Sequence, residues 1–390
     1  MNRDANAGDA WFPLLVTLCL SVTGTLIFKV LPLVVGAAAE SYALSPSQLG
    51  QLASSDLAGI AVASVVAPLW VRRVDWRSAA RVALLLVIVG NVLSIKYFSF
   101  DALLAVRFVT GLGEGTATGL ALVILGDSRN PDRNFGMAMA APILLGVVGF
   151  KFLPLVIAQA GFAGVMMVLA AVSTVIFLLL SGLPRAGYRN HERRERVGGS
   201  TALVFLALLA TFFNHLAIGA VWAFVERLGD AAGLARDTVS AALGIAVMLG
   251  FCGAVCATFQ GGRWGRGLPL TLSVLGQLLA LYLLSLVSTP SQFRIAVCLF
   301  QFCWLYAGAY QLATIARVDS SGRFFVLTIA FQAGGITVGP ALAGALIEKA
   351  GFSPMLFVAG LAFVVSIVLF WWVLGVARNV SPQAAHAVHL

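Results

Sequence analysis

The sequence predicts an all-α polytopic membrane protein, with twelve transmembrane helices arranged as two pseudo-symmetric six-helix bundles. Of the 390 residues, 60% are hydrophobic and only 11% are charged, whereas a soluble domain carries roughly 45–50% apolar and about 25% charged residues. The apolar residues also form blocks, such as 12–38 and 201–225, that reach the ~20 residues needed to cross a bilayer. Five cysteines in a chain of this length make no disulfide framework.

Charged residues and Pro, Gly or Ser clusters separate twelve apolar spans. Their expected limits are 12–38, 48–71, 79–95, 101–126, 135–158, 162–182, 201–225, 238–260, 268–288, 294–316, 324–347 and 353–377. The third is short, so we expect it to borrow residues from its flanks. The first is too long for the apolar region of a signal peptide, so we interpret it as an uncleaved helix. Barrel strands are excluded because they have about ten residues of alternating polarity.

One long hydrophilic stretch divides the chain. We expect an N-terminal six-helix bundle at 1–182, a basic cytoplasmic linker at 183–200 and a C-terminal six-helix bundle at 201–390. Corresponding spans of the two halves start about 190 residues apart, which is a regularity typical of duplicated transporters.

The positive charges predict the orientation. Alternate sides of the spans carry 17 and 5 Lys and Arg residues. Because basic loops stay in the cytoplasm, both termini are expected there, in a bacterial inner (cytoplasmic) membrane. The net charge of +9 then reflects topology, and no nucleic-acid partner is expected.

Two helix motifs resemble those of the major facilitator superfamily of transporters. The fourth span contains Leu103-x-x-x-Arg107-x-x-Thr110-Gly111-x-Gly113, which is similar to the fourth-helix motif of that family. The eleventh span contains Gly335-x-x-x-Gly339-Pro340-x-x-Ala343-Gly344, which is similar to the GxxxGPxxGG motif of proton antiporters. The fifth span, where that motif normally lies, keeps Pro142 and Gly146. We expect these small residues to pack helices closely.

The loop after the second span resembles the family's gating signature. It keeps Arg72, Arg73, Asp75 and Arg77, but Val71 stands where the signature has its acid. The resemblance implies secondary transport by two rocking halves, a gating contact at this loop, and a role for Arg107 in proton coupling or substrate response.

Five ionisable residues fall inside the predicted spans: Lys29, Asp56, Arg107, Glu114 and Lys151. Such a residue costs about 2.5–3.5 kcal/mol even on insertion scales, so each needs a reason. Lys29, Asp56, Arg107 and Lys151 share one slab roughly 9–14 Å below the outer surface, whereas Glu114 lies deeper, on the same helix face as Arg107. One interpretation is structural, pairing Lys29 with Asp56 and Arg107 with Glu114 or helix-end carbonyls.

The other interpretation is functional. Lys29, Arg107 and Lys151 would bind an anion, and Lys151 has no obvious acidic neighbour. The second half offers polar and aromatic groups instead, namely Asn214, Trp222, Gln301, Trp304, Tyr310 and Gln332. A charged half facing an aromatic half suits an amphipathic anion, although helix packing would also explain the aromatic residues. Glu114 or Asp56 is the predicted proton-coupling carboxylate. His215 could carry protons or form a hydrogen bond in the core, and Glu114 could simply neutralise Arg107.

The motifs that are missing restrict the function further. We find no P-loop, no metal-ligand spacing and no nucleophile–base–acid set, so we expect no ATP-driven transport, no cofactor, no metal site and no enzyme. The favoured function is a monomeric secondary transporter of a small organic anion or amphipathic metabolite, with protons as the coupling ion and the bilayer as its environment. The alternatives are proton-coupled efflux of apolar or cationic compounds, and a non-transporting membrane sensor on the same fold.

Overall fold

The structure is a computed structural model that describes residues 11–96, 99–128, 130–185, 201–319 and 327–386. Every regular element in these ranges is a helix. The elements are α1 (Trp11–Lys29), α2 (Leu31–Ser41), α3 (Pro46–Trp70), α4 (Trp76–Ser94), α5 (Phe100–Gly126), α6 (Pro131–Leu179), η2 (Leu180–Gly182), α7 (Thr201–Ala231), α8 (Arg236–Gln260), α9 (Gly267–Ser285), α10 (Pro290–Val318), α11 (Leu327–Ala350) and α12 (Phe352–His386). This confirms the predicted all-α class. Most of the predicted linker lies outside the described residues.

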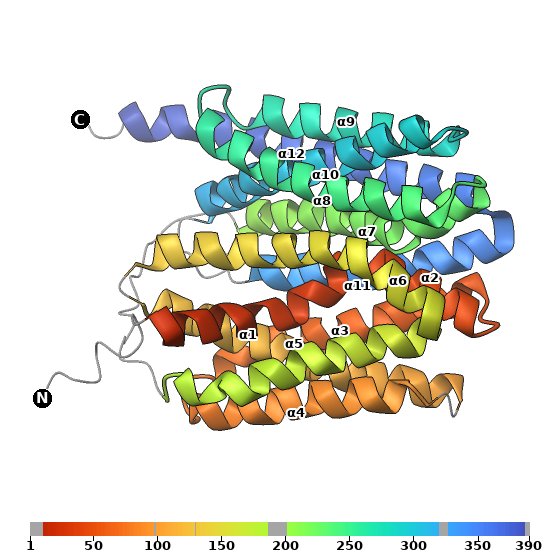
Figure 1. The fold of residues 1–390 in the computed structure, drawn as a ribbon. Coiled ribbons are helices and arrows are strands. Elements are labelled where there is room, and N and C mark those ends of the chain that lie inside the picture. Colours follow the sequence, from red (N-terminus) through yellow and green to blue (C-terminus); the bar gives the residue numbers. More distant parts are fainter. Residues whose placement is uncertain (1–10, 97–98, 129, 186–200, 320–326, 387–390) are drawn as a thin grey trace, which may run out of the picture.

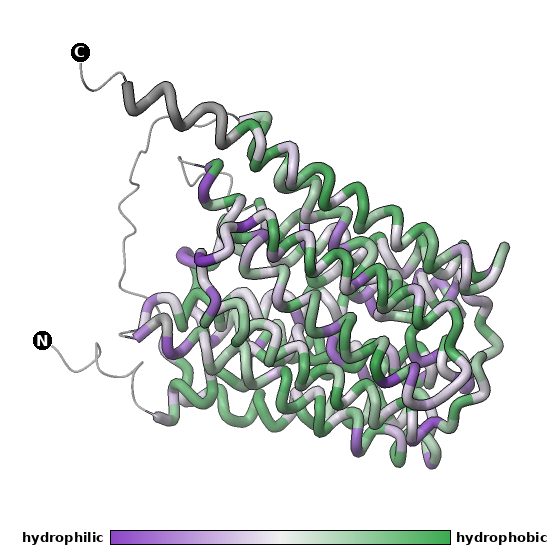
Figure 2. Tube along the Cα trace, turned by 90° about the horizontal axis from the view of Figure 1, so that it is seen from above, coloured by the Kyte–Doolittle hydropathy of each residue, from purple (hydrophilic) through white to green (hydrophobic). Residues whose placement is uncertain are grey.

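The helices run along a common direction, and both chain ends lie at the same end of the bundle (Figure 1). We call this the proximal end and the opposite one the distal end. Hydrophobic residues cover most of the length of the helices, whereas hydrophilic residues gather toward the ends (Figure 2). Eleven of the helices in the described ranges are long and apolar enough to cross a membrane.

Helix α6 contains two of the predicted spans. The backbone turns at Gly161, whose φ of 55° and ψ of −144° are not helical. Only glycine adopts this conformation without steric cost. The Phe162 N–H donates to Ser41 Oγ at 2.8 Å, which ties the corner to the end of α2. Residues before and after Gly161 therefore form the fifth and sixth spans, and the twelve-span prediction agrees with the structure.

The first predicted span is two helices. Val30, with φ −96° and ψ 10°, separates α1 from α2. Because Pro32 has no N–H, the carbonyl of Phe28 lacks its usual helical donor. The indole N–H of Trp222, on α7, donates to that carbonyl at 2.8 Å. The expectation of one continuous helix over 12–38 is therefore wrong, and a residue of the other half satisfies the break.

Within each half, small residues let the helices approach closely. A Cβ at Gly113 would lie 2.6 Å from the Ala83 carbonyl oxygen, and one at Gly111 would overlap that of Asp56. In the C-terminal half, α11 packs on α7 in the same way. Side chains at Gly335 and Gly339 would overlap the carbonyl oxygens of Phe212 and Leu216 respectively.

The two halves meet along three helix pairs, α3 with α11, α6 with α8 and α2 with α7. The α3–α11 contact is reciprocal near the distal end. Gly50 packs against the Pro340 carbonyl, and Gly344 packs against the Pro46 carbonyl. These contacts hold the two halves together at that end.

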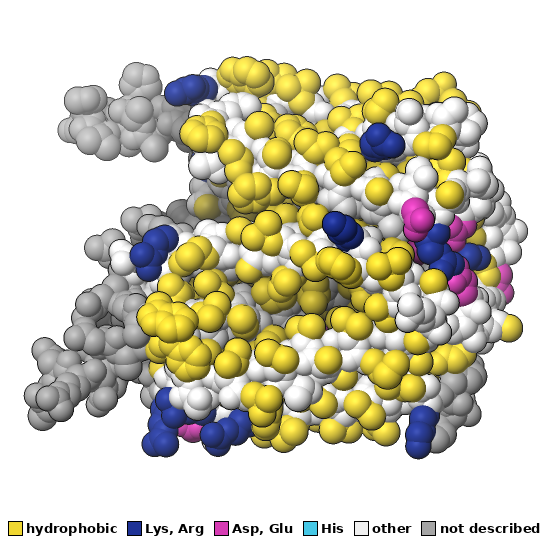
Figure 3. Space-filling view, in the orientation of Figure 1, with side chains coloured by type: hydrophobic (Ala, Val, Ile, Leu, Met, Phe, Trp, Pro, Cys, Tyr) yellow, Lys and Arg dark blue, Asp and Glu magenta, His cyan; other side chains and the backbone are white. Residues whose placement is uncertain are grey.

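Polar contacts also close the distal end. Arg236, the first residue of α8, forms an ion pair with Glu40 of α2. Glu348 of α11 accepts hydrogen bonds from the Ser45 hydroxyl at 2.7 Å and from the Ser47 N–H at 2.9 Å. Acidic and basic side chains gather at this end of an otherwise largely apolar surface (Figure 3).

Candidate functional site

A charged network lies inside the N-terminal half. The Arg107 guanidinium donates to Asp56 Oδ2 at 2.5 Å and to Asn91 Oδ1 at 2.7 Å. Glu114 Oε1 lies 3.9 Å from the same guanidinium. These side chains come from α3, α4 and α5. Arg107, Asp56 and Glu114 are 2%, 4% and 2% exposed, respectively.

The network has one more carboxylate than it has cations. Asp56 Oδ1 and Glu114 Oε2 have no hydrogen-bond partner. Helix packing fixes the pair, because Gly111 sits against the Asp56 carbonyl. The sequence alone suggested pairing Asp56 with Lys29 and Arg107 with Glu114. The first pairing is wrong, since Asp56 binds Arg107, and the second contact is the longer of the two.

Lys29 lies instead at the junction of the two halves. Its ammonium is 5.0 Å from the ring centroid of Trp304 on α10, and its Cβ is next to Gly146 of α6. Among the described residues it forms no ion pair and no hydrogen bond. A cation at membrane depth without a carboxylate partner is costly. An anionic ligand that pairs with the Lys29 ammonium would lower this cost.

Aromatic side chains of both halves pack at the same junction. Phe28 packs edge-on against Trp304, with ring centroids 5.6 Å apart. Phe150 packs edge-on against Trp222 at 6.1 Å, and Trp222 holds the Phe28 carbonyl. We call Phe28, Lys29, Phe150, Trp222 and Trp304 the junction cluster. It combines one cation with apolar ring surface from both halves.

The remaining predicted residues of the C-terminal half are scattered. Asn214 and Gln301 are buried, and their amide atoms have no hydrogen-bond partner. His215 Nδ1 bonds the Thr211 carbonyl at 2.9 Å, as expected for a core histidine. Tyr310 packs against Tyr306 with ring centroids 5.3 Å apart, and Gln332 is half-buried on α11. Among the described residues, no hydrogen bond or ring contact joins these side chains to the junction cluster.

Lys151 follows Phe150 of the junction cluster on α6, but its side chain faces the outside of the molecule. It is exposed and lines a groove of about 430 Å³ between α6 and α8, together with Asp237, Leu155 and Met248. Leu155 and Met248 are exposed apolar residues, as expected of a lipid-facing surface. The groove also contains the acidic neighbour that the sequence did not reveal.

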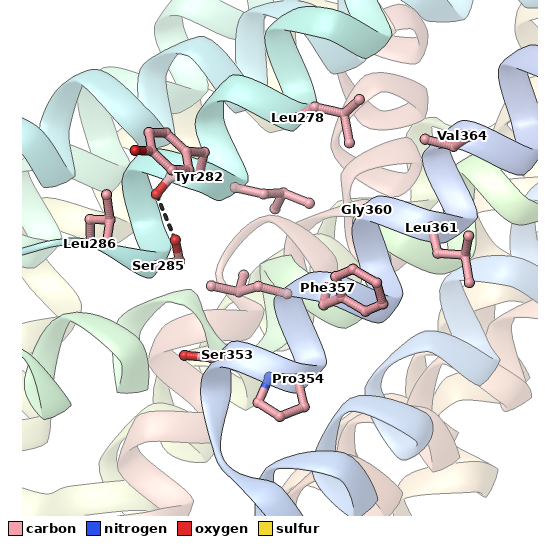
Figure 4. A pocket seen from close by; sticks show the side chains of 12 residues that line it. Leu278, Tyr282, Ser285, Leu286, Ser353, Pro354, Phe357, Gly360, Leu361 and Val364 are labelled. Atoms are coloured by element: carbon pink, nitrogen blue, oxygen red, sulfur yellow. Dashed lines mark hydrogen bonds between the residues drawn. The ribbon is translucent and has the colours of Figure 1, made fainter.

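A second groove on the outside of the C-terminal half, between α9 and α12, has a volume of about 840 Å³ (Figure 4). Its lining includes Tyr282, Phe357 and Leu361 and no charged side chain. Its lining offers nothing that would select a charged ligand.

The predicted gating loop is held to its own half. Arg72 donates to both carboxylate oxygens of Asp127, at 2.5 and 2.9 Å, and Arg77 donates to the Leu183 carbonyl. Asp75 caps α4 by accepting the Ser78 N–H at 2.7 Å, and this hydrogen bond holds the pKa of Asp75 below its ordinary value. Arg73 is exposed. Sequence reasoning missed Asp127 because it follows a different helix.

Sequence reasoning also missed Glu226. The seventh span was expected to end at 225, but α7 continues to Ala231. Glu226 is 3% exposed and faces Gly36 of α2 across the junction. Because Glu226 directly follows the apolar run, the sequence placed it at the membrane surface rather than in the interior.

Comparisons with known proteins match this architecture. A family model described as the Major Facilitator Superfamily matches residues 14–318. No curated protein sequence matches the chain.

Three solved structures share the fold over nearly the whole chain. A bacterial homolog of the human lysosomal transporter Spinster, in an inward-facing and occupied conformation, has a TM-score of 0.72 and 15% identity, covering 96% of this chain and 97% of that one. The nucleoside transporter NupG gives 0.75 and 11%, covering 93% and 99%. The xylose transporter XylE from E. coli, partially occluded and inward-open, gives 0.73 and 13%, covering 92% and 97%.

Proposed function

Because the chain belongs to the Major Facilitator Superfamily, we propose that it is a proton-coupled secondary transporter that moves a small amphipathic organic anion by alternating access. The observation that carries the substrate class is the Lys29 ammonium at the junction of the halves, beside Trp304 and without a carboxylate partner. The cell location follows from the loop charges: the proximal end would be cytoplasmic, and the protein would sit as a monomer in a bacterial inner membrane.

The junction cluster supports an anion that carries an apolar body. A substrate carboxylate could replace the ring face as the partner of Lys29, and the released Trp304 and Phe28 rings could then pack on the rest of the substrate. Charge-assisted hydrogen bonds are the stronger ones in a protein interior, whereas ring contacts alone select shape weakly. The site therefore favours one negative group over none.

The network around Arg107 supports proton coupling. Two carboxylates and one guanidinium are removed from water together, and such a group is electrically neutral only when one carboxyl holds a proton. Glu114 is the better candidate because it is the carboxylate farther from the guanidinium. We infer that Glu114 gains and loses the coupled proton, while Asp56 stays paired with Arg107.

Two polar contacts between the halves support a closed distal end: the ion pair of Glu40 with Arg236 and the hydrogen bond from Ser45 to Glu348. The loop arginines at the proximal end bind within their own half. We infer an inward-facing state, in which substrate would exchange through the proximal end.

Purified protein in proteoliposomes tests the proposal, with radiolabelled benzoate as the anionic probe and ethidium as the cationic one. An imposed pH gradient is expected to drive benzoate uptake in the wild type. Glu114→Gln is expected to abolish gradient-driven uptake and to keep benzoate exchange, because exchange needs no net proton movement. Asp237→Asn, which removes an exposed carboxylate that the proposed mechanism does not use, serves as the matched control and should keep the gradient dependence.

The outcomes separate the alternatives. Movement of ethidium but not of benzoate would favour efflux of cationic compounds. Binding of benzoate without movement under any gradient would favour a sensor. Unchanged proton dependence in Glu114→Gln would remove that residue from the coupling role.

A further inference from the structure

Glu226 occupies an unusual place at the distal closure. Its side chain is buried between α7 and α2, and Oε2 has no hydrogen-bond partner. A Cβ added to Gly36 would overlap this carboxylate, so the carboxylate lies directly against the backbone of α2. The carboxylate is thus enclosed by contact between the two halves.

The charged groups around Glu226 leave it unneutralised. On its own helix, Arg227 and Asp230 lie 3.7 Å apart and bind each other in partly exposed positions. The charged side chains that the packed helices carry near this end are Glu40 on α2, Arg236 and Asp237 on α8, Arg294 on α10, and Glu348 and Lys349 on α11. Glu40 and Arg236 bind each other. Within the described residues, no cation forms an ion pair with Glu226.

We propose that Glu226 is a proton-binding site of the distal closure: the carboxyl holds a proton while the halves are closed there, and releases it to water when they separate. An ionised carboxylate without a cation is too costly to enclose in this way, whereas a neutral carboxyl is far less so. The inference rests on the alternating-access part of the proposed function and is independent of the substrate.

The direction of the pH effect follows from the proton count. The closed state binds one proton more than the open state at this residue, so raising the pH disfavours closure. For a single linked proton, the ratio of closed to open molecules falls by at most about tenfold per pH unit.

Spin-label distances across the distal end test this. Labels at Asp101→Cys and Ser291→Cys, both exposed at the starts of α5 and α10, report the separation of the halves in nanodiscs. The five native cysteines are replaced, and Glu114→Gln is included so that the Arg107 network does not titrate. Raising the pH is expected to move molecules from the short to the long distance.

Glu226→Gln should stay at the short distance at every pH, because the amide mimics the protonated carboxyl. The matched control, Asp237→Asn, removes an exposed carboxylate at the start of α8 that forms no ion pair or hydrogen bond among the described residues, and it should keep the pH dependence. An unchanged pH dependence in Glu226→Gln would overturn the proposal.

A second pair of variants guards against a trivial folding defect. Gly36→Ala places a methyl group against the carboxylate and should populate the long distance at every pH, while Gly36→Ala with Glu226→Ala should restore the short one. Gly36→Ala that closes like the wild type would count against the proposal. A distance that responds to benzoate but not to pH would overturn the role of Glu226 alone. A distance that responds to neither would overturn alternating access as well.

Discussion

At the residue scale, the molecule separates its two kinds of intramembrane charge. Arg107 is bound by Asp56 and Asn91 inside one half, whereas the Lys29 ammonium lies over the Trp304 ring of the other half. Both are expensive at membrane depth. The cost of burying Arg107 is offset by its contacts with the Asp56 carboxylate and the Asn91 amide. The Lys29 ammonium has no such partner and can pair with a charged ligand.

Replacing Lys29 tests which lysine binds the anion. Lys29→Ala is expected to weaken benzoate binding by about 10- to 150-fold, the equivalent of the 1.5–3 kcal/mol of a hydrogen bond to a charged group. Lys151→Ala, which removes the same charge from the outer groove, should bind benzoate normally. Calorimetric titration of the purified protein gives both constants. The reverse result would centre the anion site on Lys151.

The break between α1 and α2 offers a second test at this scale. Trp222→Phe keeps the ring contact with Phe150 but removes the donor to the Phe28 carbonyl, and a buried unsatisfied carbonyl costs about 1–3 kcal/mol. We expect a lower melting temperature. Pro32→Ala restores a backbone N–H that can reach this carbonyl, so the double variant should lose less than Trp222→Phe alone. Strictly additive melting shifts would contradict the role assigned to Trp222.

At the element scale, glycine and proline positions decide where the halves can touch. Gly50 and Gly344 expose backbone to the partner helix, and each meets a proline carbonyl of that helix. The contact is therefore backbone to backbone, without intervening side chains. Such a contact is either closed or open, because there are few side chains that could rearrange to fill an intermediate separation of the two helices.

A larger residue at this contact should hold the distal end open. Gly344→Val would overlap the Pro46 carbonyl, and overpacking of this kind costs about 1–3 kcal/mol, which is a 5- to 150-fold shift in a two-state ratio. The distal spin-label distance measures the shift. Gly375→Val on α12, where nothing lies within 4 Å of an added Cβ, is the control and should behave as the wild type. Equal distances in both variants would mean that α3 and α11 do not set the closure.

At the scale of the whole molecule, the two ends differ in charge. Basic residues dominate the loops of the proximal end, whereas the ion pair of Arg236 with Glu40 and the hydrogen bonds to Glu348 join the halves at the distal end. Basic loops are retained in the cytoplasm, so we propose that this asymmetry orients the chain with its proximal end in the cytoplasm.

Reporter fusions test the orientation. Alkaline phosphatase fused after Leu390 is expected to be inactive, because this enzyme folds only outside the cytoplasm. The same reporter inserted into the distal loop at 286–289 should be active. The opposite pattern would reverse the assignment of both ends.

The spans and the family were predictable from the sequence, and both predictions are confirmed, because hydropathy records burial in lipid and the motif around Arg107 is local. The partners of these residues were not predictable. Periodicity on one helix does not say that Asp56 reaches Arg107, or that Trp222 replaces the amide that Pro32 lacks. Glu226 escaped notice because its burial comes entirely from packing at the far end of α7.

The position of Glu226 limits what its proton can do. The carboxyl meets water only when the distal end is open, so a proton taken from that side returns to the same side in the next cycle. Such a proton adds nothing to the number carried per substrate molecule. The distal pH would then set how often the transporter turns over without changing its stoichiometry.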